Sequence, residues 1–539
     1  MSPADHEPPA AGPTEARVRL VNCFARPYDG AVAAARTCYA SQGIVAPADV
    51  AGDGLPPERA RRRQARRDAL AADIYQAGHH TTFQHAHLQF TLENVSRQFV
   101  WSFLHAHPFY NSEQVSQRYV AVAPDAFYEP PLPAGLAEEY RAVVHEQMEA
   151  YHALDRQLRP LVSDEFFRIF PARRRRPERW ESAIRRKSME VARYVLPLAT
   201  LTRLYHTISA ITLLRYRRLA RQFDAPGEQQ AVVERMVEEL VRFDPDSARL
   251  IEESLPLEET LEHRFYAAAA ASGAPAGEAD AAACAAEFDA ALDGLTSRLV
   301  SRLPDNEALL AQAVREVLGL PRARLDDATA IALVLDPERN EYLSGALDLT
   351  STSKLMRTLV HPRYAFRKRL SHTADSQDQR HRLTPASRPC LAAYLTRDPD
   401  VVTPGLVLAD DGAAAAYRAI TTRTWERIDA LRRRGLTDEQ AAYLLPNAVA
   451  LRFTESADLA GLRHKLEMRL CYNAQEEIWQ ASLDEARQIA TAEPLIGRHL
   501  LPPCTLRLRA GVTPVCPEGK RYCGVRVWDL ELDAYERLL

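Results

Sequence analysis

Length, composition and charge exclude several classes of protein. The chain has 539 residues, of which 46% are hydrophobic and 26% charged, enough to bury a large core in more than one domain. A formal net charge of −4 excludes nucleic-acid binding through a global basic field, so anions would have to bind at local patches. We recognise no secretory signal and no apolar run long enough to span a membrane, so we expect a cytoplasmic protein without a membrane partner. Eight cysteines over this length do not suggest a disulfide framework and leave reduced thiols or a local metal site.

The composition changes along the chain predict its domain boundaries. Residues 1–16 are rich in proline, alanine and acidic side chains without periodicity, which predicts a disordered lead. Residues 268–284, AAAASGAPAGEADAAAC, interrupt a helical stretch with Gly and Pro and predict a linker. These limits leave a first domain at 17–267, a second at 285–495 and a cysteine-containing tail at 496–539.

A histidine-rich stretch, GHHTTFQHAHLQFTLENVSR, runs from Gly78 to Arg97. Its alternating apolar residues Leu88, Phe90 and Leu92 predict a half-buried strand that follows a polar loop. The histidines fit a metal site, a nucleotide or cofactor pocket, or a polar strand face. The strand pattern alone does not decide among these three interpretations of the histidines.

An arginine run, RRRRPERW, occupies residues 173–180. Such a run can hold phosphates, but charge runs usually mark a solvated surface. We therefore interpret it as an exposed insertion.

Two collinear matches indicate that the halves arose by tandem duplication. The pair Leu196-Pro197 in the first half stands in step with Leu445-Pro446 in the second. The interval between His105-Ala106-His107 and the segment 116–119 also equals that between Arg367-Lys368-Arg369 and the segment 378–381. The sequences have otherwise drifted far apart.

The opening stretch resembles a segment of flavin-dependent thymidylate synthases, G-H-x-[ST]-x-F-E-H followed by a strand and V-S-R. The hallmark of that family is R-H-R-x(2)-S-x-N-E-x-S-x-R-Y, and the first half offers HAHPFYNSEQVSQRY, in which His105 and His107 replace the arginines and Gln114 the glutamate. The matching residues are Gly78, His79, Thr81, Phe83, His85, Phe90, Val95, Ser96 and Arg97 in the first segment and Ser116, Arg118 and Tyr119 in the hallmark.

The C-terminal element of the same family matches the second half better. Ala220 stands in the first half where the family has an essential arginine, and Arg221 beside it points about 100° away on a helix. The two halves have therefore lost different family elements: the first half keeps the hallmark loop, and the second half keeps the C-terminal element. The segment DLAGLRHKLEMRLCYNAQEEI keeps His464, Arg469, Ala474, Gln475, Glu477 and Ile478 in register.

The resemblance implies an α+β fold of two tandem domains and a function, the reductive methylation of dUMP to dTMP. In this family FAD supplies the hydride, methylene tetrahydrofolate the carbon and NADPH the reducing power. Family members are homotetramers with sites between subunits, so a fused chain is expected to form a homodimer, a pseudo-tetramer. By the same resemblance, residues of the histidine-rich segments would line the flavin pocket: His79, Thr81, Gln84, His105, His107 and His464.

The chemical properties of the hallmark residues suit them to binding a nucleotide. Ser116 and Arg118, beside Gln114, would bind a nucleotide phosphate through charge-assisted hydrogen bonds. Asp378, aligned with Ser116, would repel a phosphate, so we expect no nucleotide at the second loop. Arg469 would face the pyrimidine carbonyls and stabilise the charge that develops on the ring. The triplet Arg367-Lys368-Arg369 would either neutralise a flavin pyrophosphate or be an exposed helix end.

Two other functions stay open at this point. Imidazoles at His105 and His107 are weaker anion partners than guanidiniums, which favours a repurposed flavoprotein acting on another pyrimidine nucleotide. A non-catalytic nucleotide-binding descendant is the alternative from another class. Flavin absorbance separates it from either enzyme.

The tail contains a possible metal-binding group. Three cysteines and a histidine fall in one short segment punctuated by Pro and Gly, which is a ligand set typical of zinc. The alternative is buried or free thiols in a loop-rich tail. The four candidate ligands are His499, Cys504, Cys516 and Cys523.

Overall fold

A computed structural model describes residues 15–105, 109–221, 227–272, 277–345, 347–391 and 395–537. Most of the predicted lead, residues 1–14, lies outside this range, and the first strand begins at Arg17. No helix in the described part of the chain is long and apolar enough to cross a membrane.

The first domain contains a four-stranded antiparallel sheet in the order β1-β2-β4-β3. The predicted strand is confirmed as β2, His87–Ser96, and Leu88, Phe90 and Leu92 are all completely buried on its inner face. The other strands are β1 (Arg17–Cys23), β3 (Asn111–Gln114) and β4 (Leu201–Ser209).

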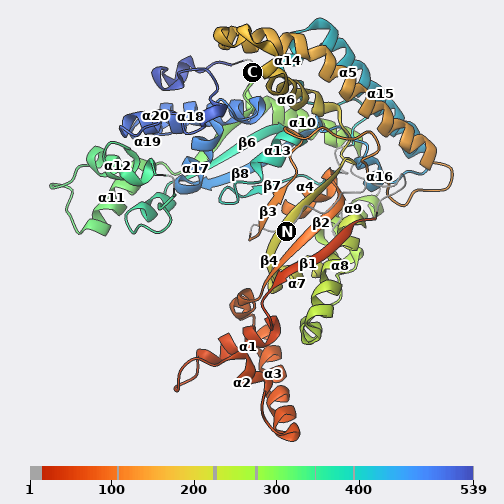
Figure 1. Ribbon diagram of the computed structural model, residues 1–539, viewed down its shortest axis with the longest axis vertical. Coiled ribbons are helices and arrows are strands. Elements are labelled where there is room, and N and C mark those ends of the chain that lie inside the picture. The colour runs from red at the N-terminus through yellow and green to blue at the C-terminus, as the bar shows by residue number, and fades with distance from the viewer. Residues whose placement is uncertain are drawn as a thin grey trace.

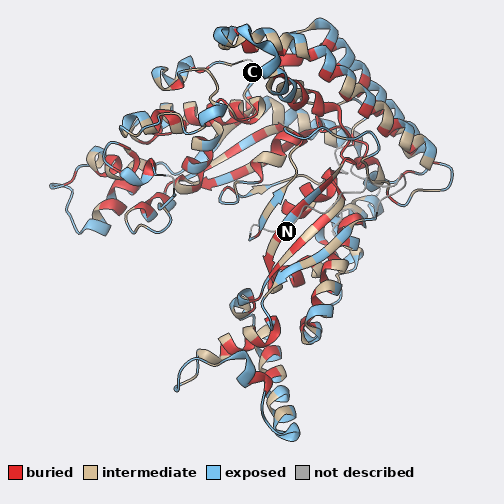
Figure 2. Ribbon diagram, viewed as in Figure 1, coloured by how far each residue is buried: buried red, intermediate tan, exposed pale blue. Residues whose placement is uncertain are grey.

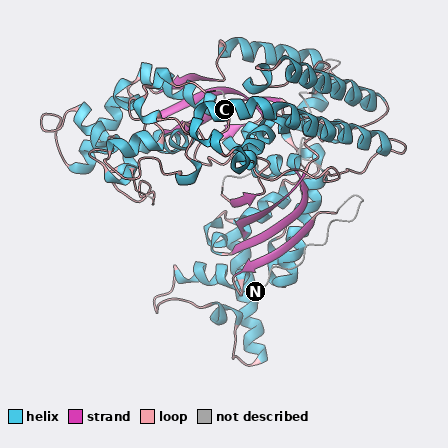
Figure 3. Ribbon diagram, turned by 45° about the horizontal axis from the view of Figure 1, so that its top comes forward, coloured by secondary structure: helices cyan, strands magenta, loops and turns pink. Residues whose placement is uncertain are grey.

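The second domain repeats this topology in a sheet of order β5-β6-β8-β7. The repetition of the strand order confirms the duplication and the α+β class (Figures 1 and 3). Its strands are β5 (Ser297–Arg302), β6 (Arg363–Ser371), β7 (Ala386–Ser387) and β8 (Ala450–Asp458).

Helices pack against both sheets, and the long α5 (Ala137–Ile169) packs along α15 (Asp411–Arg433) (Figure 1). Of the predicted linker, residues 268–284, the described parts are the end of α9 and the start of α10. The other helices of the first domain are α1 (Pro27–Thr37), α2 (Pro47–Ala51), α3 (Pro57–Gln76), α4 (Arg97–His105), α6 (Glu181–Ala192), α7 (Ala210–Arg218), α8 (Gly227–Phe243) and α9 (Leu261–Ala271). Those that follow are α10 (Glu278–Leu292), α11 (Asn306–Leu318), α12 (Asp327–Leu335), α13 (His372–Asp378), α14 (Gly405–Leu408), α16 (Asp438–Ala442), α17 (Leu459–Arg469), α18 (Glu476–Ala492), α19 (Pro494–Gly497) and α20 (Pro503–Arg509).

The equivalent helices α7 and α17 begin directly after the equivalent strands β4 and β8. Each is capped by the last strand residue: Ser209 accepts from the amide of Thr212 at 3.4 Å, and Asp458 from that of Gly461 at 2.8 Å. A side-chain oxygen at this position satisfies an amide that the helix leaves unpaired. The caps fix where each helix leaves its sheet.

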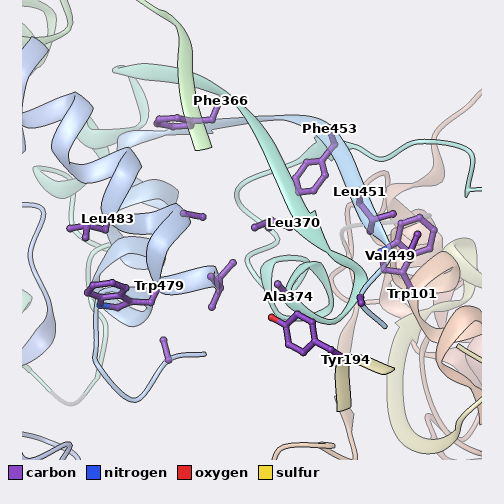
Figure 4. Close-up of a cluster of buried hydrophobic side chains, with 14 of the residues drawn as sticks. Trp101, Tyr194, Phe366, Leu370, Ala374, Val449, Leu451, Phe453, Trp479 and Leu483 are labelled. Atoms are coloured by element: carbon purple, nitrogen blue, oxygen red, sulfur yellow. The ribbon is translucent and has the colours of Figure 1, made fainter. Parts of the chain in front are cut away.

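The two domains meet through their Leu-Pro segments, residues 194–199 and 443–448. The amide of Leu198 donates to the carbonyl of Leu445, and the amide of Asn447 to that of Leu196, both at 2.8 Å. Such reciprocal bonds are expected when two copies of one segment cross about a pseudo-two-fold axis. One hydrophobic core continues across the junction, where Trp101 and Tyr194 of the first domain lie beside residues of β6, α13 and β8 (Figures 2 and 4).

Candidate nucleotide and cofactor site

The hallmark segment forms a loop that leaves β3 and is held by the start of α4. Arg97, the first residue of α4, donates to the side-chain carbonyl of Gln114 at 2.8 Å and to the backbone carbonyl of Val115 at 2.6 Å. The hydroxyl of Ser116 accepts from the amide of Arg118 at 3.2 Å. This short polar loop therefore lies beside the sheet, held by the side chains of Arg97 and Ser116.

Arg118 and Arg469 both bind segments of the second domain beside this loop. Arg118 donates through Nε to the carboxylate of Glu190 and through Nη2 to the carbonyl of Asn473 at 2.8 Å. Arg469 donates to His381 Nε2 at 2.8 Å and to the carbonyl of Gln377 at 2.9 Å. Asn473 lies in the turn that follows α17, and Arg469 is the last residue of that helix, so both arginines contact the chain at the C-terminal end of α17.

Five arginines gather around this loop, and we call them the arginine cluster: Arg97, Arg118, Arg193, Arg380 and Arg469. Burial, together with the charges of Arg193 and Arg380, lowers the pKa of Arg97 to about 9. Burial lowers the pKa of Arg469 to about 10, and Arg380 and Arg118 act in the same direction against Asp378. Mutual repulsion of this kind is characteristic of a site built for an anion.

Few carboxylates offset the cluster. The pKa of Glu190 is lowered to about 2 because the neighbouring cations Arg118, Lys187 and Arg193 outweigh burial. The side chains of Arg97 and Arg193 keep buried nitrogens, Nε and Nη2, without a hydrogen-bond partner. Buried donors of this kind normally have an acceptor, so the cluster can accept an anionic ligand.

A cavity of about 270 Å³ opens beside Arg118, between α5 and α6 of the first domain and the C-terminal tail. Burial lowers the pKa of Lys187, which lines this cavity, to about 8. Arg173 lies over the ring of Phe170 at 3.5 Å and that of Trp180 at 4.0 Å, so the arginine run is partly packed and is not only a solvated insertion. The cavity is lined by cations, carboxylates and aromatic rings: Arg118, Arg168, Arg173, Arg186, Lys187, Lys520, Arg521, Arg537, Glu165, Glu190, Glu518, Glu536, Tyr119, Phe166, Phe170, Trp180, Tyr472 and Tyr522.

A second cavity, of about 300 Å³, lies on the other side of the loop. Leu104 and Tyr110 line it, and Arg380 and Arg382 reach it from the second domain. Sequence reasoning missed these two arginines as ligand-binding residues. Its remaining lining comes from the sheet and from β3: Gln89, Asn111, Ser112, Glu113, Gln114, Tyr205 and Thr207.

The structure separates the other predicted cofactor residues. His79, Thr81 and Gln84 are exposed on or beside the short 3₁₀ helix η1 (His80–His85), and none of them lines the two cavities. His105 ends α4, but its side chain, like all of His107, lies outside the described residues. His464 is exposed on α17, 6.2 Å from the ring of His381.

The sequence comparison aligned Asp378 of the second domain with Ser116 of the first, and this alignment is wrong. Strand β7 pairs Ala386 with Glu455, just as β3 pairs Ser112 with His206, so the counterpart of Ser116 follows β7. Asp378 instead ends α13, and Arg367-Lys368-Arg369 lies within β6 rather than at a helix end. Equal sequence intervals misled the comparison because they were counted across elements that do not correspond.

Two of the three charges of the triplet are paired with carboxylates in the structure. Lys368 is completely buried, and its ammonium lies 3.1 Å from Asp378, 2.9 Å from Glu455 and 2.8 Å from Glu485. Arg369 donates to Asp400 at 3.2 Å, and Arg367 lies 5.4 Å from the ring of Phe288. Carboxylates therefore compensate the charges of Lys368 and Arg369, whereas Arg367 is exposed.

Two lysines and three carboxylates therefore form a buried charge cluster in the second domain: Lys368, Asp378, Glu455, Lys465 and Glu485. The offset that relates Pro197 to Pro446 places Glu455 opposite His206 and Lys465 opposite Tyr216. In the first domain those two residues pack in an aromatic group with Phe103. At equivalent positions, the first domain has an aromatic group and the second has ion pairs.

The predicted zinc ligands do not assemble as a set. His499 lies apart from the three cysteines, in a different cavity that Asp336, Arg498 and Arg509 also line. Both of its ring nitrogens are buried without a hydrogen-bond partner, and burial lowers its pKa to about 4. Within the described ranges, no three His, Cys, Asp or Glu side chains are arranged as a closed metal-binding group.

Comparisons with known proteins agree with the duplicated fold. A family model described as thymidylate synthase complementing protein matches residues 19–246 and 298–495. The flavin-dependent thymidylate synthase of Geobacter sulfurreducens is 28% identical over 236 residues, which covers 42% of this chain and 92% of that protein. Two solved structures align with TM-scores of 0.29. One is the UMP/dUMP methylase PolB of Streptomyces cacaoi bound with 5-Br dUMP, which is 20% identical and covers 44% of this chain and 94% of that chain. The other is the flavin-dependent thymidylate synthase ThyX of Helicobacter pylori complexed with FAD and dUMP, which is 18% identical and covers 38% of this chain and 100% of that chain. Because the family model matches most of both domains, this chain belongs to the flavin-dependent thymidylate synthase family as a tandem duplication.

Proposed function

We propose that this protein is an FAD-dependent enzyme that reductively methylates dUMP to dTMP with methylene tetrahydrofolate and NADPH. The observation that carries the proposal is the arginine cluster, because it gathers cations from both domains around the one hallmark loop that keeps its serine and arginine. Neither domain supplies this set alone. The proposal therefore assigns each chain one composite nucleotide site.

The nucleotide would bind with its phosphate at the loop and its base toward α17. Ser116 and Arg118 offer a hydroxyl and a guanidinium, which bind a phosphate through charge-assisted hydrogen bonds. A phosphate would compete with Glu190 for Arg118, and Lys187 beside it would add a further positive charge. Arg469 would stabilise electron density on the pyrimidine, where a fixed charge in a water-poor site acts most strongly.

The flavin would lie against the 300 Å³ cavity. Its lining offers the guanidiniums of Arg380 and Arg382 for a pyrophosphate and the exposed ring of Tyr205 for stacking. The donors fit the group, although they are not the triplet that the sequence suggested. Bound FAD would supply the redox chemistry, while the protein orients it and the nucleotide.

One observation favours a second candidate, a flavoprotein that methylates another pyrimidine nucleotide. Gln114 stands where the family has a glutamate, and it is held by Arg97 with its side-chain carbonyl at 2.8 Å. A neutral amide in place of a carboxylate changes which nucleotide hydroxyl or donor group is accepted beside the loop. The substrate therefore has to be tested with both ribo- and deoxyribonucleotides.

The test is a reconstitution of the full chain. We expect purified protein to take up FAD, with the absorbance of a bound flavin, and to convert dUMP to dTMP when both co-substrates are supplied, as measured by mass spectrometry. Conversion of UMP in preference to dUMP would support the second candidate. Failure to take up flavin while dUMP still binds would identify a non-catalytic nucleotide-binding protein. Light scattering checks the homodimer expected of a fused pair.

A further inference from the structure

A groove of about 400 Å³ lies between α12, the turn that follows α19 and the end of α20, elements that Figure 1 shows at the left of the second domain. It shares no lining residue with the two cavities of the candidate nucleotide and cofactor site. Its volume falls in the range of small-molecule sites, about 300–1,000 Å³. The groove is lined by Ala328, Thr329, Ala332, Asp336, Glu338, Arg339, Arg498, His499 and Arg509.

A glycine sets the position of the turn after α19. Gly497 ends α19, and a Cβ atom there would lie 2.3 Å from the Cα of Ala490 in α18, so the two helices approach more closely than another residue would allow. Helix α19 also packs against α12, which forms another wall of the groove. The two residues after the glycine, Arg498 and His499, are thereby brought to the same groove as α12.

Three exposed arginines line the groove, and none of them forms an ion pair in the described part of the chain: Arg339, Arg498 and Arg509. The guanidinium of Arg509 donates to the backbone carbonyl of Arg498 at 3.1 Å, which is an uncharged acceptor. Guanidiniums that share one groove repel one another, and a bound anion would relieve this repulsion.

His499 is a buried polar side chain in the wall of the same groove. It is 6% exposed, and neither ring nitrogen has a hydrogen-bond partner within the described residues. Burial lowers its pKa to about 4; Asp336 opposes this effect, and the charges of Arg498 and Arg509 add to it. The imidazole is therefore neutral near pH 7, with one N–H donor and one acceptor nitrogen. Buried groups of this kind normally have a partner, and an acceptor bound in the groove would supply one.

Two carboxylates indicate a ligand that is more than a simple anion. Asp336 and Glu338 line the groove together with the arginines, and Oδ1 of Asp336 accepts from the amide of Glu338 at 3.1 Å. Carboxylates oppose a phosphate but accept hydrogen bonds from hydroxyl groups. Among the described residues, no phenyl, phenol or indole ring lines the groove, so it offers no such surface for stacking on a nucleobase.

We propose that this groove binds a phosphorylated small molecule that carries hydroxyl groups and no aromatic ring, such as a sugar phosphate. The three arginines would hold the phosphate, because their planar N–H forks match its oxygens. The N–H group of His499 would donate to the same phosphate, and the two carboxylates would accept from the hydroxyl groups. Binding involves no covalent step. The proposal does not depend on the proposed function, since the groove and the nucleotide site share no lining residue.

Isothermal titration of the full chain with glucose 6-phosphate tests the proposal. We expect binding whose affinity falls about tenfold or more in the double variant Arg498→Ala/Arg509→Ala, because two charged donors are removed. The matched control is Arg324→Ala, at an exposed arginine before α12 that does not line the groove, and it should bind like the unaltered chain. Undiminished binding in the double variant would overturn the proposal. So would binding that is lost in Arg118→Ala instead, because the phosphate would then lie at the hallmark loop.

Thermal unfolding of the unaltered chain keeps the test independent of variants that fail to fold. Glucose 6-phosphate should raise the melting temperature more than inorganic phosphate or glucose does at the same concentration. No rise, or an equal rise with inorganic phosphate, would overturn the proposed class of ligand. His499→Gln, which keeps a donor, should retain more affinity than His499→Ala, and equal losses would contradict the contact of His499 with the phosphate. Failure of dUMP to bind would contradict the proposed function and leave these results unchanged.

Discussion

The hydroxyl of Tyr194 in the first domain donates to the carboxylate of Glu477 in the second at 2.5 Å. The relation is repeated in the opposite direction, because the hydroxyl of Tyr443 donates to Glu228 at 3.2 Å. Each carboxylate also accepts from the serine that ends the equivalent strand, Ser371 or Ser96, at 2.6 Å. The duplication has thus preserved a tyrosine, a glutamate and a serine on both sides of the junction.

Tyr194→Phe should destabilise the chain more than Tyr443→Phe. It removes the shorter of the two interdomain bonds and leaves Gln475, which also donates to the Tyr194 hydroxyl, without that acceptor. A buried group left without its partner costs about 1–3 kcal/mol. Urea unfolding measures the difference, with Tyr342→Phe at an exposed tyrosine as the control. Equal stability of Tyr194→Phe and the control would contradict this role.

Lys368→Met should be strongly destabilising although the new side chain is of similar size. It leaves three buried carboxylates facing Lys465 alone, and breaking a buried ion pair in this way costs about 3–5 kcal/mol. Thermal unfolding measures the loss. The matched substitution Lys354→Met, at an exposed lysine, should change the melting temperature little. A stable Lys368→Met variant would show that the cluster does not need its second cation.

The stability of the chain should fall as the pH rises from about 6.5 to 8. Burial and the nearby charge of Asp378 raise the pKa of Glu455 to about 7, and burial raises that of Glu228 to about 7. In the unfolded chain these glutamates have an ordinary pKa near 4.3 and are already ionised at pH 6.5, whereas the folded state still binds their protons. This difference stabilises the folded state, and the stabilisation is lost as the pH rises through 7. His372, whose pKa burial lowers to about 3, acts in the opposite direction but only below its unfolded value near 6.5.

Glu455→Gln isolates the contribution of that carboxyl group. Because the amide does not titrate, the variant should lose less stability than the unaltered protein between pH 6.5 and 8, by at most about 1.4 kcal/mol per pH unit. Urea midpoints at several pH values provide the comparison. Parallel curves for the two proteins would show that Glu455 is ionised throughout this range.

Arg118→Ala and Arg469→Ala should have different kinetic effects. Under the proposed function, removing Arg118 deletes the proposed phosphate contact and should weaken dUMP binding by about 1.5–3 kcal/mol. Removing Arg469 should lower kcat more than it raises Kd, because its charge matters most when the ring becomes electron-rich. Arg62→Ala, at an exposed arginine of α3, is the control. Identical effects of the two site variants on Kd and kcat would contradict their separate roles.

The sequence predicted what depends on local periodicity and on contiguous motifs. The alternation of Leu88, Phe90 and Leu92 identified β2, because one side of an antiparallel strand faces the core. The Leu-Pro match identified the segments that cross at the domain junction, where Leu198 meets Leu445. The family resemblance supplied the fold class.

The sequence could not predict relations that depend on packing between distant segments. Counting residues from Arg367 to Asp378 gave a false equivalence, because the interval begins within strand β6 in the second domain and at the end of helix α4 in the first. Arg380 and Arg382 reach the cavity beside β3 only through the folding of the second domain against the first. Cys471 is likewise remote in sequence from the three tail cysteines with which it lines one small cavity.

The central claim is that each chain has one nucleotide site, built from both domains. Isothermal titration of the full chain with dUMP in the presence of FAD tests it most directly, because it counts sites as well as measuring affinity. We expect one dUMP per chain, with the affinity reduced in Arg118→Ala. Two dUMP molecules per chain, or binding that is indifferent to Arg118, would contradict a single composite site.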